Sequence, residues 1–251
     1  MIACAASEQR RETLKQRQGK LWGTLMGIRT ELPLRCLTAL LALLAVGAIS
    51  FSASAQDAGD TPALAMTRAP ANGGAKLNVT STVFHDGQAL PQRYTQFGDN
   101  QSPPLRWSKG PKGTHSYVVL LEDTGIKRSL PFSHWVLYNV PAKVTRLPAN
   151  LSKDAQLQTP RGAMNGEELP PLAQLRPTAL NQHKQPGYMG PKPPKGQTHP
   201  YHFEVFALDE TLSLTPAMAD REAVVDAMKG HVLAAGQIIS NVPGQSNVPA
   251  Q

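Results

Sequence analysis

The sequence predicts a mainly β protein, with antiparallel sheets, one peripheral helix near the C-terminus and a long loop region. Three observations lead to this prediction. Short segments with the two-residue period of a strand, or with an unbroken apolar run, recur through residues 76–242. Only residues 220–232 have the period of a helix, and residues 148–186 are rich in proline with few periodic apolar positions. With no repeat or heptad pattern, residues 76–242 are expected to form one domain.

Residues 1–55 have the features of a secretory signal peptide. A basic stretch precedes an apolar run at 37–49, and a small-residue cleavage pattern follows it and ends at Ala55. The run is shorter than the ~20 residues of a membrane-spanning helix, which makes an uncleaved anchor the weaker alternative. We therefore expect cleavage after Ala55 and a periplasmic or secreted protein.

The polar stretch before Met26 is longer than the charged region of an ordinary leader. The N-terminus is therefore predicted to be over-extended, with translation starting at Met26. Removal of residues 1–55 lowers the formal net charge from +7 to +3, which argues against a nucleic-acid partner. Cys4 and Cys36 leave with this segment, so the mature chain has no disulfide and depends on its buried core.

The first part of the mature chain is predicted to be a linker followed by two extended pieces. Residues 56–75 are rich in Ala, Pro, Gly and Thr without an apolar period, which is typical of a flexible linker. Alternating apolar residues over 77–84 predict a strand that ends at the turn pair Asp86-Gly87. A second short extended piece is expected over residues 90–97.

The middle of the chain contains two more predicted strands. Residues 116–121 form the most apolar run of the mature chain and have the length of a strand that is buried on both faces. Residues 134–140 predict a strand that stops before Pro141, because proline cannot donate to a sheet. A loop over residues 124–133 joins the two.

The C-terminal part carries the only predicted helix. Residues 220–232 place Asp220 in the first turn and Lys229 in the last, where each charge complements the helix dipole. Ile238-Ile239 predicts a final short strand, and residues 243–251 are expected to be a disordered tail.

Residues 187–209 are predicted to form a stiff loop followed by a strand, and they contain side chains that can bind a ligand. Prolines fix the loop, and Gly187, Gly190 and Gly196 permit positive φ. The strand period then places His199 and Tyr201 on one face, and residues such as His202 on the other. The same alternation argues against a metal pair formed by His199 and His202.

Three motifs together resemble a known family. One is Gly-x-Asn-x-Ser-Pro-Pro-Leu-x-Trp over residues 98–107, the second is the run His134-Trp135 to Pro141, and the third is the Gly/Pro loop with His-x-Tyr in residues 187–209. They are similar to the phosphatidylethanolamine-binding protein (PEBP) family, in its bacterial Raf-kinase-inhibitor-like branch. The resemblance covers residues 77–239 and implies a PEBP-like antiparallel β-sandwich.

The resemblance also implies a small pocket that takes an anionic head group. The residues carried over to it are Asp123, Phe132, His134, Gly190, Pro193, His199 and Tyr201. Two imidazoles, a phenol and loop amides can donate to phosphate oxygens, and a nearby carboxylate can hold a histidine protonated. The implied function is non-catalytic binding of a phospholipid head group or phosphate ester, without a metal or cofactor. Peripheral membrane contact, a protein partner and a homodimer are left open.

Two positions depart from the family pattern. Thr124-Gly125 stands where the family's Asp-Pro-Asp motif continues with Pro-Asp, so the second carboxylate is missing unless Glu122 supplies it. Pro200 stands where the family has an arginine between His199 and Tyr201. The head-group preference of relatives is therefore not carried over.

Three alternative functions are considered. The first is a protein-interaction or inhibitor module for a kinase or peptidase, which would use exposed residues of the 148–186 loop. The second is a hydrolase that uses the His/Asp cluster. The third rests on Asp123-Thr124-Gly125, the signature of aspartic proteases. That chemistry needs a second such motif, which the chain lacks, so only a homodimer could supply it.

Overall fold

The computed structural model describes residues 62–126, 128–169 and 184–245. All of them belong to one compact unit, Asp57–Gln251. The signal peptide predicted over residues 1–55 and the start predicted at Met26 lie outside the described residues. Within the described part of the chain, no helix is long and apolar enough to cross a membrane.

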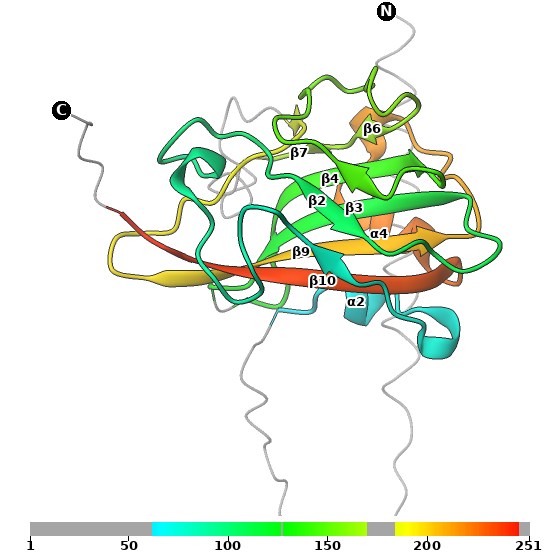
Figure 1. The fold of residues 1–251 in the computed structure, drawn as a ribbon, viewed down its shortest axis with the longest axis horizontal. Coiled ribbons are helices and arrows are strands. Elements are labelled where there is room, and N and C mark those ends of the chain that lie inside the picture. The colour runs from blue at the N-terminus through cyan, green and yellow to red at the C-terminus, as the bar shows by residue number, and fades with distance from the viewer. Residues whose placement is uncertain (1–61, 127, 170–183, 246–251) are drawn as a thin grey trace, which may run out of the picture. The chain divides into compact units, whose positions relative to one another are not determined.

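The centre of the unit is a five-stranded antiparallel sheet (Figure 1). In spatial order its strands are β10 (Val232–Pro243), β9 (Thr198–Leu208), β3 (Ser116–Asp123), β4 (Phe132–Pro141) and β6 (Met164–Asn165). Every residue of β3 is buried. This confirms the prediction that the apolar run is covered on both faces.

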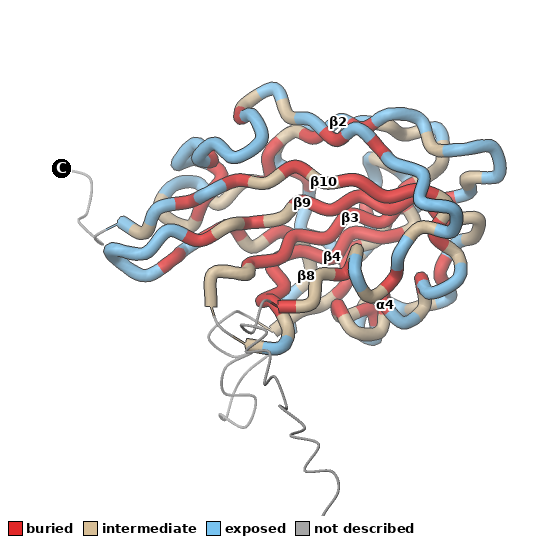
Figure 2. The backbone as a smooth tube through the Cα atoms, turned by 90° about the horizontal axis from the view of Figure 1, so that it is seen from below, coloured by how far each residue is buried: buried red, intermediate tan, exposed pale blue. Residues whose placement is uncertain are grey.

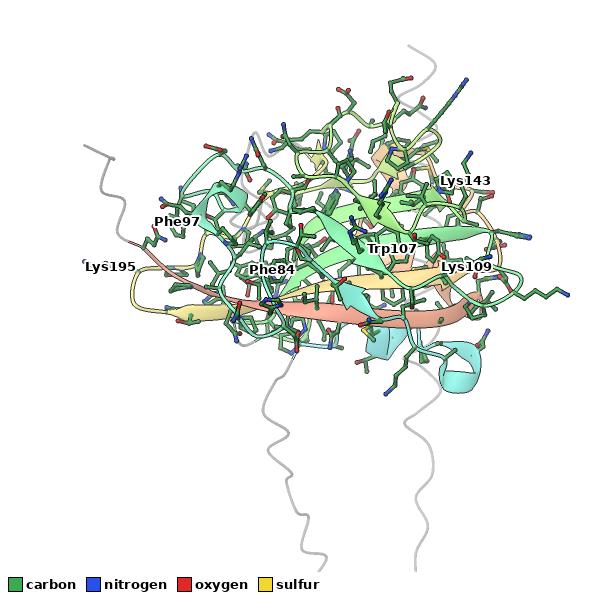
Figure 3. The ribbon with its side chains drawn as sticks, viewed as in Figure 1. Phe84, Phe97, Trp107, Lys109, Lys143 and Lys195 are labelled. Carbon is green, nitrogen blue, oxygen red and sulfur yellow. The ribbon has the colours of Figure 1, made fainter. Side chains whose placement is uncertain are left out.

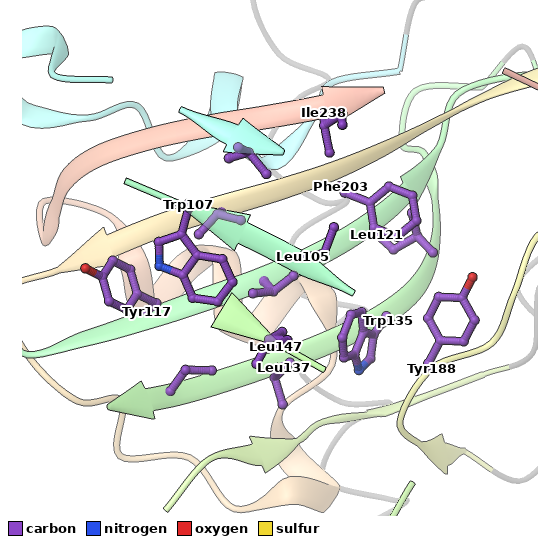
Figure 4. Packing of buried hydrophobic residues seen from close by; sticks show 14 of the residues in the cluster. Leu105, Trp107, Tyr117, Leu121, Trp135, Leu137, Leu147, Tyr188, Phe203 and Ile238 are labelled. Carbon is purple, nitrogen blue, oxygen red and sulfur yellow. The ribbon is translucent and has the colours of Figure 1, made fainter. Parts of the chain in front are cut away.

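A small sheet covers one face of the large one and completes a β-sandwich. It contains β1 (Val79–Thr80), β2 (Leu105–Trp107) and β5 (Arg146–Leu147), in the order β1-β2-β5. The core on this side is shown in Figure 4, where Leu105 and Trp107 of β2 pack over side chains of the large sheet such as Phe203. Trp107 meets the ring of Tyr117 edge-on, with 5.4 Å between centroids. The predicted mainly β sandwich is thereby confirmed.

The other face of the large sheet is covered by helix α4 (Arg221–Met228), which lies opposite β2 in Figure 2. Its Val224 and Met228 join a second apolar cluster with sheet residues such as Phe206. Asp220 caps the helix by accepting from Ala223 N–H. The predicted end at residue 232 is wrong, because the chain turns at Gly230 (φ 83°) and residue 232 already begins β10.

The linker predicted over residues 56–75 is wrong for its described part. Residues 65–68 form the short helix α2 (Ala65–Arg68), and Ala65 and Ala69 are completely buried against the α4 side of the sheet. A second short helix, η1 (Asn72–Gly74), follows. Alanine has the best helix propensity and is small enough to fit against a packed sheet, so a composition that looks like a linker can also form a packed segment. We call residues 63–69 the N-terminal segment.

Buried charged groups hold the N-terminal segment in place. Glu122 accepts from Ala65 N–H at 3.1 Å, and Glu204 accepts from Met66 N–H at 3.3 Å. Arg221, which is 4% exposed, donates to Glu122 and to the carbonyl oxygen of Ala63. Burial and the neighbouring Glu122 charge raise the pKa of Glu204 well above its usual value. This cluster therefore joins both ends of the domain to the middle of the sheet.

Glu168 makes the stability of this region dependent on pH. It lies on β7 (Glu167–Glu168), which pairs with β8 (Gln185–Pro186), and accepts from Arg221 N–H. Burial raises its pKa from 4.5 to about 7. Because the folded-state pKa exceeds the unfolded one, the stability of the fold is expected to fall as pH rises from about 4.5 to 7.

Glu168→Gln is expected to weaken this pH dependence and to make the protein more stable than the wild type above about pH 7. Urea unfolding at a series of pH values measures the effect. Glu167→Gln removes the same charge from the neighbouring residue and is the matched control. An unchanged pH slope in Glu168→Gln would contradict the assignment.

Other predicted elements differ in extent from the structure. Of residues 77–84 only Val79–Thr80 is paired, although Leu77 is buried as the alternation predicts. The piece expected to be extended at 90–97 contains the 3-10 helix η2 (Gln92–Tyr94) instead, and another, η3 (Pro216–Met218), precedes α4. The final strand is the long β10 rather than a short piece around Ile238-Ile239.

The predicted tail and long loop are also partly ordered. Of the tail predicted over 243–251, Pro243 belongs to β10 and Gly244 N–H donates to Gln197 O at 2.7 Å. The long loop contributes β6 to the edge of the large sheet, where Asn165 accepts from the indole N–H of Trp135 at 3.0 Å. Its residues 170–183 and the tail from 246 lie outside the described residues.

Candidate functional site

Three neighbouring strands bring the predicted polar residues together at one end of the large sheet. Asp123 ends β3, Phe132 begins β4, and the two are partners across the sheet. On its other side Asp123 is the partner of Tyr201 in β9. His134 and His199 follow at two residues from Phe132 and Tyr201, on the same faces. The site residues predicted on the strands thus form one cluster, and its four polar side chains are at most 4% exposed.

Asp123 holds His199 rather than facing a ligand. Its Oδ2 lies 2.9 Å from His199 Nδ1, and its Oδ1 accepts from Gly125 N–H at 2.7 Å. With both oxygens engaged, the carboxylate fixes the orientation of the imidazole. Asp123 is therefore a positioning residue in this structure.

Gln197 occupies the other side of the His199 ring. Its Oε1 lies 2.9 Å from His199 Nε2. An amide oxygen accepts but cannot donate, so this contact requires a proton on Nε2. Together with the contact to Asp123, it engages both nitrogens of the ring. Gln197 itself is exposed.

His134 presents an unused nitrogen to the same cluster. Its Nδ1 donates to Met189 O at 2.9 Å, while its buried Nε2 has no hydrogen-bond partner among the described residues. Burial lowers the pKa of His134, although the Asp123 charge opposes this shift. The ring is accordingly neutral at pH 7, with a lone pair on Nε2 that can accept a hydrogen bond.

Tyr201 lies between the two histidines. Its ring meets that of His134 edge-on at 5.2 Å and stacks on that of His199 at 6.5 Å between centroids. Burial, the charge of Asp123 and hydrogen bonding to Asp123 raise the pKa of the phenol. Tyr201 therefore remains protonated and serves as a wall and a hydrogen-bonding group.

The remaining predicted site residues, Phe132, Gly190 and Pro193, have different roles in the structure. Pro193 is buried in the loop before β9, and Phe132 is buried under the guanidinium of Arg128, which lies 4.5 Å from the ring centroid. Gly190 does not offer a free amide. Its N–H donates to Asn100 Oδ1 at 2.7 Å, and its carbonyl accepts from Gln96. This amide is therefore not free to donate to a ligand.

Gly190 has a packing reason to be glycine. A Cβ there would lie 2.7 Å from the carbonyl oxygen of Tyr94, so no side chain fits. Asn100, in the Gly-x-Asn motif, holds the loop by that amide contact, and Ser102 accepts from Leu151 N–H. The motif around residues 98–107 thus builds the frame of the site rather than its surface.

The departure at Thr124-Gly125 also has physical consequences. A Cβ at Gly125 would lie 2.1 Å from His199 Cγ, so the ring occupies the space that a side chain would need. Glu122 cannot replace the missing carboxylate, because it points to the opposite face of the sheet and pairs with Arg221.

The described residues contain no group of three or more His, Cys, Asp or Glu that could hold a metal ion.

Comparison with known proteins identifies the family. A sequence model of the phosphatidylethanolamine-binding protein family matches residues 80–243. The chain belongs to this family. The match includes all the strands that carry the site, and it supports a ligand-binding, PEBP-like protein.

The PEBP relatives include bacterial and archaeal proteins. A UPF0098 protein of Methanothermobacter thermautotrophicus is 34% identical over 163 residues, which cover 65% of this chain and 96% of the relative. The UPF0098 protein YbhB of Escherichia coli is 34% identical over 138 residues, covering 53% and 78% of the two chains. These matches place the chain in the bacterial YbhB-type branch.

Solved structures of PEBP relatives have the same fold. The crystal structure of E. coli YbcL, described as a member of the mammalian PEBP family, is similar with a TM-score of 0.56 at 26% identity. It covers 68% of this chain and 100% of YbcL. A PEBP homolog from Chlamydia trachomatis, at 24% identity and a TM-score of 0.52, shows the likeness of fold with the same coverage.

Two contributors were missed by sequence reasoning. Gln197 fills the hydrogen-bonding position of His199, and Met189 fixes the tautomer of His134 through its backbone carbonyl. The position of Gln197, two residues before His199 on an extended chain, was an available signal because such residues share a face. A backbone carbonyl leaves no signal in the side-chain sequence.

Proposed function

We propose that this site binds a small anionic ligand, a phosphate ester or phospholipid head group, without catalysis. The observation that supports this most is the state of two imidazole nitrogens, the Nε2 atoms of His134 and His199. The Nε2 atom of His134 has no hydrogen-bond partner among the described residues. The Nε2 atom of His199 has one partner, the side chain of the exposed Gln197. A singly protonated phosphate ester offers one O–H and several acceptor oxygens, which complement this pair.

The charges of the site favour a monoanion. Asp123 already places a negative charge beside His199, with its Oδ2 2.9 Å from His199 Nδ1. A dianion would therefore add two uncompensated charges to a buried site, at a large desolvation cost. A monoanion can accept from His199 and donate its own proton to His134 Nε2. An ammonium group on the ligand would serve equally as the donor to His134.

Binding is proposed rather than turnover because neither the carboxylate nor the phenol of the cluster is free to attack. Asp123 has both oxygens engaged, and Tyr201 has its pKa raised, so its phenolate is scarce at neutral pH. A hydrolase would release product continuously, whereas a binding site saturates.

We also propose that the protein is exported and begins at Gln56, which N-terminal sequencing of the mature protein tests.

The first test is calorimetric titration with inorganic phosphate, glycerophosphate and phosphoethanolamine. Saturable binding is expected, and His199→Ala is expected to abolish it because the buried donor is lost. His202→Ala is the matched control, since His202 lies on the opposite face of β9 and contacts Thr124 and Gln237. Absence of binding to every anion, or equal loss in both variants, would refute the proposal.

Gln197→Ala is expected to strengthen anion binding. The carboxamide oxygen of Gln197 now occupies the position that a ligand oxygen would take, so binding must first break that hydrogen bond. Removing the competitor should lower the Kd by about threefold to tenfold, the equivalent of a net hydrogen bond of roughly 1 kcal/mol. Weaker binding in Gln197→Ala would instead make Gln197 part of the site.

A further inference from the structure

A basic groove lies at the end of the sheet that is far from the histidines. It is a cavity of about 1070 Å³, which we call the groove, and it is lined by residues of β2, by residues 141–148 after β4, and by residues 159–161. Asp123 and Phe132 are partners at one end of the β3–β4 pair, whereas Ser116 and Pro141 are partners at the other. Figure 3 shows Lys143, of this groove, and Lys195, of the loop before His199, at opposite ends of the unit.

All ionisable side chains that line the groove are basic. They are Arg106, Lys143, Arg146 and Arg161. Each is exposed, and none makes an ion pair with a described residue. No acidic side chain lines the groove. Its positive potential is therefore not offset from within the described part of the chain.

Two of these arginines face each other across a strand pair. Arg106 of β2 and Arg146 of β5 are direct partners in the antiparallel register. Their neighbours Leu105 and Leu147 are also partners and point into the core, so alternation directs both arginines outward. Like charges directly opposite on adjacent strands destabilise a sheet. A feature that costs stability and lies in a groove points to a role in binding.

We propose that this groove binds an acidic, extended polypeptide segment of another protein. Guanidinium groups bind carboxylates with paired hydrogen bonds, and two arginines side by side can hold successive acidic side chains. Between the cations, Trp107, Val144 and several prolines supply apolar surface for the residues that alternate with the acids. β5 is the last strand of its sheet among the described residues, which offers a backbone edge to an extended chain.

The shape of the site favours a peptide over a membrane or a single phosphate. A cavity of about 1070 Å³ exceeds the size of one phosphate group and matches a short stretch of chain. Cations on the walls of a groove surround a chain that enters it, whereas a flat lipid surface reaches only its rim. The undescribed residues 170–183 and 246–251 contain no Asp or Glu. Residues 56–61, which remain after the proposed cleavage, have only Asp57 and Asp60, whose spacing of three does not match a segment of alternating acids.

The test measures binding of a fluorescent peptide of alternating glutamate and valine to the wild type and to Arg106→Glu. The variant places a glutamate opposite Arg146. Reversal of this charge should weaken the peptide affinity at least about tenfold. The same variant should raise the Tm, because an opposite-charge pair replaces two like charges. Loss of binding in a protein that is more stable cannot result from misfolding.

Control variants and peptides distinguish binding in this groove from attraction by net charge and from binding at the histidines. Lys76→Glu makes the same charge change at an exposed residue outside the groove and should bind the peptide normally. A peptide of alternating lysine and valine should not bind, and His199→Ala should bind the acidic peptide as the wild type does. Failure of the anion site therefore leaves this proposal intact.

Three results would overturn the proposal. One is equal peptide affinity in the wild type and Arg106→Glu. Another is an equal loss in Lys76→Glu, which would indicate attraction by net charge alone. The last is binding to phosphatidylglycerol vesicles that depends on Arg106 while the acidic peptide fails to bind, which would assign the groove to a lipid surface.

Discussion

Replacement of Arg221 by methionine is expected to lower the free energy of unfolding by about 3–5 kcal/mol. Methionine can fill much of the volume of the arginine stem, but it leaves Glu122 buried without its cation, next to Glu204. Removing one partner of a buried pair costs more than the pair itself contributes, because the remaining charge stays desolvated. The contacts with Ala63 O and Glu222 are lost as well. Urea unfolding followed by fluorescence measures the change.

Two further variants identify the cause of this loss. Arg68→Met removes a cation that pairs with Glu222 and Asp226 near the surface, and should cost less than about 1 kcal/mol. The double variant Arg221→Met, Glu122→Leu should recover much of the stability, because the unpaired buried charge is then absent. If the double variant is as unstable as the single one, lost packing rather than unpaired charge is responsible.

Gly125→Ala is expected to weaken anion binding by about tenfold to a hundredfold, the range for losing a hydrogen bond to a charged group. The added methyl would lie 2.1 Å from His199 Cγ, so the ring must leave its place between Asp123 and Gln197. Displacing a packed buried ring should also cost about 1–3 kcal/mol of stability. Calorimetric titration with inorganic phosphate and thermal unfolding measure the two effects.

Further variants separate the loss of anion binding from the loss of stability in Gly125→Ala. In a His199→Ala background the clash is absent, so adding Gly125→Ala should cause no further loss of stability, while anion binding stays absent. Thr124→Ser changes the adjacent residue without filling that space and should bind normally. Normal phosphate binding in Gly125→Ala would show that His199 does not need the position seen here.

The sequence predicted the elements whose pattern is strong. The unbroken apolar run of β3 reflects burial on two faces. The alternation at the start of β9 reflects burial on one face, because His199, Tyr201 and Phe203 are buried while Thr198, Pro200 and His202 are not. The start of α4 was also predictable, because Asp220 caps it with its own side chain. The strand period could further have shown that Glu122 and the adjacent Asp123 point to opposite faces.

Other features depend on contacts that a linear pattern does not contain. Strands of two residues, such as β1 and β5, are too short to show a period. The N-terminal segment has the composition of a linker, yet it is held by Glu122 and Glu204, which are 57 and 138 residues away in sequence. The site residues were found by motif, but the engagement of the Gly190 amide by Asn100 required the fold.

The attachment of the N-terminal segment has a consequence for the order in which the protein folds during synthesis. Its hydrogen-bonding partners include Glu204 and Arg221, and Leu77 N–H donates to Ala235 O of the last strand at 2.8 Å. This segment is the first part of the domain to leave the ribosome, and it must therefore wait for almost the whole domain before it can dock. Long-range closure of this kind slows folding and leaves no early, self-sufficient N-terminal half. The nascent chain thus stays open until β10 is complete.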